Sequence, residues 1–224
     1  MIVVDVESSG VDSRLCSLLS IGAVEFENPS NQFYVECKLF PGAHCEKEAF
    51  EVNGFTLEEV QSKQGSEQKS LHAEDGGAPL ATDEQAGFKK GGNKKSDKEA
   101  VEAFLSWMQS CKEWTLAGQN PSFDRDFLLE TAHRYHIDWP LAQRTLDLHS
   151  VAFFECMKTG KEIPRKNNHS ALNLDAILEL VGVPVKRKFH NALEDAKLEA
   201  EAFSRFVAGK PLFEEYAGFP VPRA

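Results

Sequence analysis

Two acidic side chains stand at the end of an apolar run near the N-terminus, in the sequence I-V-V-D-V-E at residues 2–7. The apolar β-formers predict a buried strand, and residues at positions i and i+2 of a strand point to the same face. Asp5 and Glu7 would therefore present adjacent carboxylates, which repel each other more strongly when they are buried. A cation or a shared proton would have to compensate for this repulsion. The alternative is that Glu7 already lies in a loop and points into water.

Two further acids lie in short segments at the start of predicted helices. Asp124 stands in N-P-S-F-D, and Asp195 stands in H-N-A-L-E-D. The helix dipole favours aspartate in a first turn, so neither residue is informative alone. Together with Asp5 and Glu7, however, they lie at strand ends and helix starts, where α/β sheets form their ligand crevices. We therefore expect the four carboxylates to converge.

Four converging carboxylates would be strongly unfavourable without cations. Ligand sets made only of oxygen prefer hard ions, which indicates Mg²⁺ or Mn²⁺. Two such ions about 4 Å apart can clamp the attacking and leaving oxygens of a phosphodiester during in-line displacement. The acid pattern thus predicts metal-assisted hydrolysis of a phosphate ester.

Such a hydrolysis also needs a base, and His190 lies five residues before Asp195, at the mouth of the last predicted helix. An imidazole with a pKa of about 6.5 suits proton transfer at neutral pH. The same spacing recurs in H-R-Y-H-I-D, between His133 and Asp138, but that copy follows a helix and is expected to be a solvated helix end. The spacing alone has little value, so a surface or capping role is the alternative for His190.

Strands and helices must bring these residues together. Strands are expected at residues 2–6, 18–27 and 33–39, and their short connections favour an antiparallel meander. A short buried strand is expected from Thr115 and another strand edge from Thr145. Helices are expected at 100–108, from Pro121 to about Tyr135 with Asn120 as the cap, and after the strand edge from Thr145 up to about Lys158. Two more are expected, from Asn173 to Gly182 and from about Leu193 to Val207. This order predicts an α/β fold with a mixed sheet, three antiparallel meander strands plus parallel strands, flanked by helices.

The chain of 224 residues suits one domain, expected at 1–210, with a tail at 211–224. Residues from about 62 to 98 have few apolar side chains and no periodicity, which indicates an insertion. That insertion is an inert linker or, because its end is rich in lysine, a flap that touches substrate. Basic residues also gather near the third acidic motif, either as solvated loop charge or as a track for a phosphate backbone: Lys158, Lys161, Arg165, Lys166, Lys186, Arg187 and Lys188.

The composition limits the classes of function. A formal net charge of −10 argues against a protein that coats nucleic acid, although an enzyme that holds one strand end needs only a few basic groups and metal ions. The five cysteines include no C-x-x-C pair, which indicates a reducing compartment without a zinc knuckle or disulfide framework. The N-terminal apolar run is too short for a signal peptide, and no stretch has the length of a membrane span. A cytoplasmic protein without membrane partners is expected.

In order, D-V-E, N-P-S-F-D and H-N-A-L-E-D resemble the three exonuclease motifs of the DEDDh family, the DnaQ-like 3′–5′ exonucleases. S-S-G after the first motif, the I-G-A-V-E-F strand and the L-N-L-D-A-I segment before the third agree with this resemblance. It implies a ribonuclease H-like fold and a 3′–5′ exonuclease that releases nucleoside 5′-monophosphates by a two-metal mechanism. Single-stranded nucleic acid or a 3′ end would be the substrate, and homodimerisation or association with a polymerase are possible in such a family.

The resemblance also assigns roles. It implies two ions of Mg²⁺ or Mn²⁺ held by Asp5, Glu7, Asp124 and Asp195, with His190 as the general base. It implies that the 3′-terminal nucleotide is held by Ser8, Ser9, Asn120 and Phe123. Two alternatives stay open: an exoribonuclease specific for oligonucleotides or dinucleotides, and a non-catalytic nucleic-acid-binding module with the same fold.

Overall fold

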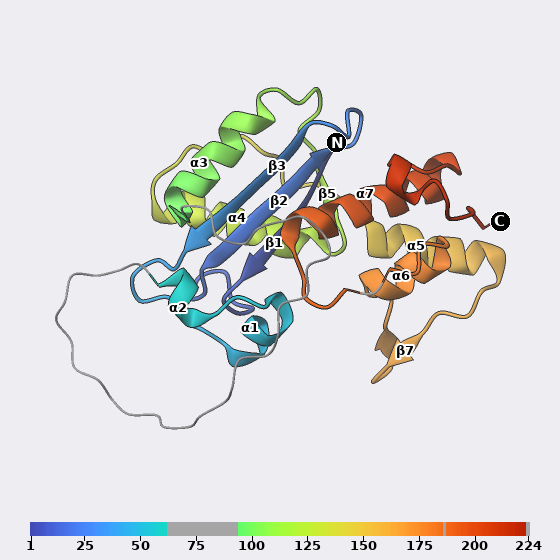
Figure 1. Cartoon of the computed structure of the whole chain (residues 1–224), viewed down its shortest axis with the longest axis horizontal. Helices are drawn as coiled ribbons and strands as arrows, with labels where there is room; N and C mark the ends of the chain where they lie inside the picture. Colours follow the sequence, from blue (N-terminus) through green and yellow to red (C-terminus); the bar gives the residue numbers. More distant parts are fainter. Residues whose placement is uncertain (62–93, 186, 223–224) are drawn as a thin grey trace.

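A mixed β-sheet forms the centre of the computed structural model, which describes residues 1–61, 94–185 and 187–222 (Figure 1). Its six strands have the order β4-β3-β2-β1-β5-β6. Their bounds are β1 Ile2–Ser8, β2 Leu18–Glu25, β3 Gln32–Lys38, β4 Lys95–Ser96, β5 Leu116–Gly118 and β6 Thr145–Asp147. The strands β1, β2 and β3 form an antiparallel meander, and β5 and β6 join β1 in parallel. The predicted mixed sheet is confirmed.

Helices cover both faces of this sheet. The helical bounds are α1 Lys47–Asn53, α2 Leu57–Val60, α3 Asp97–Met108, α4 Pro121–Arg134, α5 Leu148–Thr159, α6 Leu174–Leu180, α7 Ala192–Ala208 and a 3₁₀ turn η1 Glu214–Tyr216. A small hairpin, β7 Arg165–Lys166 and β8 His169–Ser170, projects between α5 and α6. None of the helices in the described ranges is long and apolar enough to cross a membrane.

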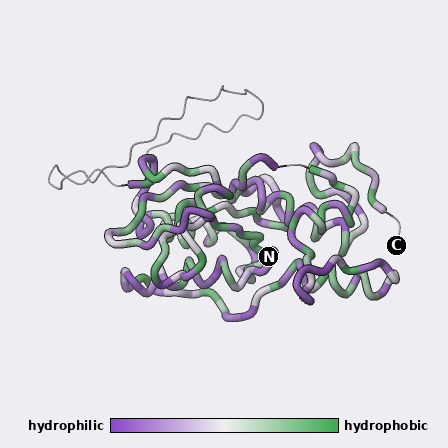
Figure 2. Tube along the Cα trace, turned by 90° about the horizontal axis from the view of Figure 1, so that it is seen from below, coloured by the Kyte–Doolittle hydropathy of each residue, from purple (hydrophilic) through white to green (hydrophobic). Residues whose placement is uncertain are grey.

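The alternation of side chains along β1 builds two buried layers. Ile2, Val4 and Val6 pack with α3 and α4 on one face of the sheet. Val3, on the opposite face, packs with Ala117 of β5 and with side chains of α5, α6 and α7. Hydrophobic and hydrophilic stretches alternate along the Cα trace, as the two-layer packing requires (Figure 2).

The predicted elements match the observed ones to within a few residues. The short elements α1, α2, β4, β7, β8 and η1 were not expected from the sequence. Asn120 does occupy the cap position of α4, but its side chain makes no capping hydrogen bond, because its backbone lies in the left-handed region with φ of 62°. Its Oδ1 atom instead accepts a hydrogen bond from Ser122 Oγ at 3.1 Å.

The end of the expected insertion belongs to the fold. Lys95 and Ser96 form β4, which pairs in parallel with Cys37 and Lys38 at the edge of the sheet. Ser96 then caps α3 in a capping box with Glu99, so the helix begins earlier than its apolar periodicity indicates. The rest of the expected insertion, at 62–93, lies outside the described residues.

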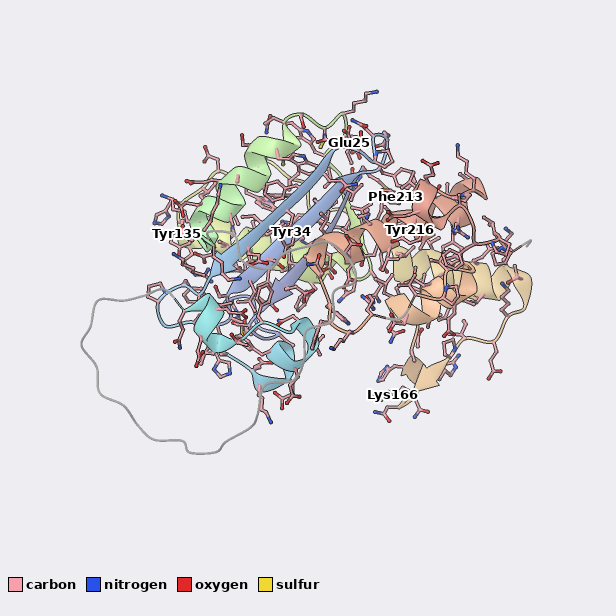
Figure 3. All side chains as sticks on the ribbon, in the orientation of Figure 1. Glu25, Tyr34, Tyr135, Lys166, Phe213 and Tyr216 are labelled. Carbon is pink, nitrogen blue, oxygen red and sulfur yellow. The ribbon has the colours of Figure 1, made fainter. Side chains whose placement is uncertain are left out.

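The C-terminal segment packs against α7. The buried side chains of Glu201 and Arg205 form an ion pair at 2.5 Å. Glu201 accepts hydrogen bonds from the backbone of Leu212 and Phe213, and Arg205 donates to the carbonyl of Tyr216. Figure 3 shows Phe213 and Tyr216 beside the C-terminal half of α7. Residues 212–216 thus form part of the packed unit, although the sequence indicates a separate tail from 211.

A glycine allows α7 to approach the sheet closely. Gly22 of β2 lies opposite Asp5 of β1 in the antiparallel register. A Cβ atom at Gly22 would lie 2.1 Å from the backbone of Ala192 and Leu193, at the start of α7. Only glycine therefore lets the first turn of α7 lie directly over the strand pair that carries Asp5.

We expect Gly22→Ala to displace the start of α7 and to destabilise the fold by roughly 1–3 kcal/mol or more, because backbone atoms cannot yield as a side chain can. Urea unfolding followed by circular dichroism measures this change. Gly218→Ala is the matched control, because a Cβ at Gly218 meets no atom within 4 Å. Equal stability of the two variants would contradict the close-approach argument.

Candidate active site

The first two acids lie on the face of β1 that α7 covers. Asp5 and Glu7 alternate with Val4 and Val6, which point into the layer of α3 and α4. Glu7 lies within the strand and is 7% exposed, so the alternative that placed it in a solvated loop is wrong. The pairing with β2 shifts between Glu7 and Ser8, so the regular ladder ends where the acids lie.

The third acid comes from the first turn of α4. Asp124 is buried, and its Oδ1 atom accepts a hydrogen bond from the backbone N–H of Val6 at 2.9 Å. This bond places Asp124 between Asp5 and Glu7 along the chain of β1. The turn before α4 is held by Asp147 at the end of β6, whose Oδ1 atom accepts from the backbone N–H of Asn120 at 3.1 Å.

The fourth acid and the predicted base come from α7 and the loop before it. Asn191 caps α7 by accepting from the backbone N–H groups of Leu193 and Glu194. Asp195 is 2% exposed, and its Oδ2 atom lies 3.7 Å from His190 Nδ1. Ligand atoms of Glu7, His190 and Asp195 lie within 4.8 Å of one another. The first and third motifs, almost 190 residues apart, therefore meet in one cluster.

The helix α1 holds the loop that carries His190. The backbone N–H of His190 donates to the carbonyl of Val52 at 3.1 Å. The side chain of Asn53 donates to the carbonyl of Ser8 at 3.1 Å, which ties the end of α1 to the end of β1. A Cβ at Gly54 would lie 2.7 Å from the Phe189 ring, so this ring packs closely against the end of α1. Sequence reasoning missed this support, although Gly54 after K-E-A-F-E-V-N is a helix-stop signal.

A cleft of about 390 Å³ opens above the acids. Its lining includes Asp5, Glu7, Asp124 and His190, and also three of the four residues expected to hold substrate: Ser8, Asn120 and Phe123. The ring of Phe123 packs on Phe127 at a centroid distance of 4.9 Å.

Ser9 does not fit its expected role in holding substrate. Its side chain is fully buried, donates to the carbonyl of His44 at 2.6 Å and accepts from the backbone N–H of Ser17 at 2.9 Å. Ser9 therefore holds the loop after β1 rather than a ligand. As expected, the second copy of the histidine-aspartate spacing lies elsewhere: His133 and Asp138 are exposed at and after the end of α4.

The electrostatics of the site are dominated by the burial of its carboxylates, and repulsion from neighbouring acids adds to this effect at Asp5. Burial raises the pKa of Asp5 well above its ordinary value, and the charges of Asp124 and Glu199 raise it further. Burial also raises the pKa of Asp124 to about 7 and raises that of Asp195. Burial lowers the pKa of His190, while the charge of Asp195 opposes that shift.

Two charged residues near the acids were not assigned to the site from the sequence. Arg187 was expected in a basic track, but its side chain is 11% exposed and forms ion pairs with Asp195 at 2.7 Å and Asp175 at 2.6 Å. The interpretation of Arg187 as part of a track for a phosphate backbone is therefore wrong, because its guanidinium is paired with Asp195 and Asp175. The second residue is Glu199, one helical turn beyond Asp195, which is 2% exposed.

The donor set fits hard divalent cations. Asp5, Glu7, Asp124 and Asp195 offer only carboxylate oxygens, which Mg²⁺ and Mn²⁺ prefer, and neighbouring negative charge raises the cost of ionising Asp5. Bound cations would reverse this cost, because they favour the charged form of each carboxyl group.

The sequence matches the family described as "3'-5' exoribonuclease Rv2179c-like domain" over residues 1–207. The chain belongs to this family. It is also 30% identical over 207 residues to the 3'-5' DNA exonuclease Cap18 of Escherichia coli, an alignment that covers 89% of this chain and 87% of that protein. DNA polymerase III PolC-type of Thermotoga petrophila is 22% identical over 92% of this chain, which spans 12% of the polymerase's length.

Solved structures show the same fold. E. coli ExoI in a zinc-bound complex with single-stranded DNA has a TM-score of 0.64 and 16% identity, over 93% of this chain and 40% of that one. The nuclease domain of 3'hExo, described as a DEDDh family member bound to rAMP, has a TM-score of 0.60 and 12% identity, over 99% of this chain and 95% of that one. The family predicted from the three motifs, and its ribonuclease H-like fold, are confirmed.

The raised pKa values make the stability of the metal-free protein depend on pH. Folded Asp5, Asp124 and Asp195 keep protons that the unfolded chain loses above about pH 4. Their stabilising effect is complete below that pH and is lost as the pH rises through about 7, the pKa of Asp124. The lowered pKa of His190 has the opposite effect, because it makes stability increase with pH up to the ordinary pKa of 6.5. One such group is outweighed by the several acids.

We therefore expect Tm measured in EDTA to fall by roughly 5–10 °C between pH 5 and pH 8. Saturating Mg²⁺ or Mn²⁺ should abolish the fall, because bound cations compensate the ionised acids. Differential scanning calorimetry measures both effects. Asp124→Asn keeps an acceptor for the Val6 N–H and should flatten the profile in EDTA. A Tm that stays constant or rises across this range without metal would contradict the electrostatic argument.

Proposed function

We propose that this chain is a metal-dependent 3′–5′ exonuclease that hydrolyses terminal phosphodiester bonds of nucleic acid and releases nucleoside 5′-monophosphates. The observation that carries the proposal is the convergence of acids: Asp5, Glu7 and Asp124 line one cleft together with His190. Asp195 of α7 lies beside Glu7 and His190 at this cleft. Membership of a family described by 3′–5′ exonuclease activity supports it.

Asp5, Glu7, Asp124 and Asp195 hold two divalent cations, Mg²⁺ or Mn²⁺, in this proposal. When bound, the cations stabilise the negative charge on the attacking and leaving oxygens of the phosphodiester. The chain contributes by fixing the acids before substrate arrives: β1 sets Asp5 and Glu7, the Val6 N–H sets Asp124, and the close approach of α7 to Gly22 sets Asp195.

His190 accepts the proton of the attacking water. Its pKa lies below the ordinary value because of burial, so the imidazole is neutral at physiological pH and can act as a base. Asp195 near its Nδ1 atom favours the imidazolium that forms when the proton arrives. The hydrogen bond from the His190 backbone to Val52 keeps the ring at the cleft.

The 3′-terminal nucleotide occupies the cleft beside Ser8, Asn120 and Phe123. The half-buried ring of Phe123 offers an apolar surface for the base or sugar. The relatives' names divide between DNA and RNA, so the proposal covers single-stranded ends of both. An oligonucleotide-specific exoribonuclease is the second candidate; the description of the family supports RNA as its substrate. Association with a polymerase is the corresponding partner hypothesis, which the match to PolC-type polymerases supports.

The test is digestion of matched end-labelled DNA, RNA and duplex substrates with free or blocked 3′ ends in Mg²⁺. We expect stepwise shortening from free 3′ ends, no shortening of blocked ends, and no activity in EDTA. His190→Ala should lower kcat by a factor on the order of 100 or more while substrate binding persists, because only proton transfer is removed. Asp5→Asn should abolish the metal-dependent activity.

Normal turnover in His190→Ala would remove this residue from the mechanism, and retained activity of Asp5→Asn at ordinary Mg²⁺ would refute its role as ligand. Digestion limited to fragments of a few nucleotides would favour the oligonucleotide-specific alternative. Binding of strands by a folded protein without any cleavage would favour a non-catalytic module.

We also infer that the β7–β8 hairpin holds the strand upstream of the cleft. Asn167 and Asn168, with φ of 51° and 64°, form its tight turn, and Arg165 and Lys166 are exposed on it. Lys166 lies at the outer end of the hairpin, away from α6 (Figure 3). A second hollow of about 420 Å³ is lined by Lys166 and His169 and shares Gln119 with the acidic cleft. The two hollows thus adjoin, and the ammonium group of Lys166 at the second hollow can contact a phosphate backbone.

Charge reversal at Arg165 and Lys166 should raise KM for a long single strand on the order of tenfold and reduce its salt dependence, while kcat for a dinucleotide changes little. The matched control reverses Lys112 and Lys210, which are exposed outside both hollows. Steady-state kinetics at several salt concentrations measure the effect. Equal KM changes in the two double variants would indicate a general effect of net charge and sink the hairpin assignment.

A further inference from the structure

Glu199 stands apart from the four acids that the motifs identify, yet it belongs to the same cluster. It lies on α7 four residues after Asp195, so the two side chains share one face of the helix. The side chain is 2% exposed. Asp5, on β1, interacts electrostatically with Glu199 as well as with Asp124, Glu7 and Asp195. The sequence signal for Glu199 is only its helical spacing from Asp195.

The surroundings of Glu199 are the ends of the strands that carry the site. A Cβ at Gly118, the last residue of β5, would lie 3.2 Å from Glu199 Oε2 and 2.9 Å from the carbonyl of Val4 on β1. The backbone N–H of Gln119 hydrogen-bonds to the carboxylate. The Oε2 atom accepts no hydrogen bond from any residue in the described part of the chain. Glu199 is thus a buried carboxylate with one oxygen free, directed at the edge where the acids meet.

A second buried acid on the same helix shows what a structural role requires. Glu201 is also buried, but its oxygens are satisfied by Arg205 and by the backbone N–H groups of Leu212 and Phe213. Within the described residues no cation forms an ion pair with Glu199; the charges of Asp124 and Asp195 raise its pKa after burial itself, and the more distant charge of Arg187 only partly opposes them. A glutamate kept in such a place is unfavourable for folding unless a cation arrives.

We propose that Glu199 supplies a fifth carboxylate to the divalent-cation site, with Oε2 as its contributing atom. The inference rests on the proposed metal-dependent function and adds a residue to its metal site.

The test measures cation binding without substrate. Isothermal titration of Mn²⁺ into Glu199→Gln should show affinity on the order of tenfold or more below that of the unaltered chain. The gain in Tm on adding Mn²⁺ should also be smaller for this variant than for the unaltered chain. Glu194→Gln is the matched control: it removes one charge from the same helix, but its side chain is 45% exposed and pairs with Lys197.

Asp195→Asn in the same titration separates the two proposals. Loss of Mn²⁺ affinity in Asp195→Asn but not in Glu199→Gln overturns the role of Glu199 and leaves the proposed function standing. Absence of Mn²⁺ binding by the unaltered chain would overturn both. If Glu199→Gln fails to fold, as judged by circular dichroism, Glu199→Asp is the second variant. It keeps the carboxylate but shortens the side chain by one methylene, which moves the oxygens away from the other acids. Unchanged Mn²⁺ affinity in that folded variant likewise overturns the role of Glu199.

Discussion

The burial of several carboxylates at one edge of the sheet is the constraint on which the site of this protein depends. The sheet, the two helical layers and the loop before α7 all bring negative side chains to one edge, where burial raises the cost of every charge. Such an arrangement is held by the rest of the fold rather than by its own contacts. The apolar packing of β1 against both helical layers stabilises the fold, and part of this stability offsets the cost of burying the carboxylates.

The supporting elements position the acids by holding the backbone around them in place, and not by hydrogen bonds between the acidic side chains. The Val6 N–H holds Asp124, the cap at Asn191 begins the helix that carries Asp195, and the end of α1 holds the backbone of His190. Asp5, Glu7 and Asp124 therefore line the cleft, and Asp195 lies beside His190. Gly22 serves the same purpose, because the absence of a side chain there lets the start of α7 lie closer to the sheet than a Cβ atom would allow.

Much of this could be predicted from the sequence. The spacing of Asp5 and Glu7 identifies one face of a strand, and the three motifs identify both the fold and the acids. Local patterns report secondary structure well where apolar periodicity is strong, as in β1 and α7. They fail for α1, whose seven residues bury little, and for the cap of α4, where a left-handed backbone turns Asn120 away from its expected bond. The partner of Arg187 and the environment of Glu199 depend on tertiary geometry, which no local pattern contains.

The order of the elements has a consequence for biosynthesis. Asp195 and His190 come from the last helix and the loop before it, and α7 also covers the apolar face of β1 and β5 that includes Val3 and Ala117. A nascent chain that has not yet released α7 from the ribosome holds an incomplete acid cluster and an uncovered sheet face. Completion of the acid cluster and coverage of this sheet face therefore coincide during synthesis, at the moment when α7 packs onto the sheet.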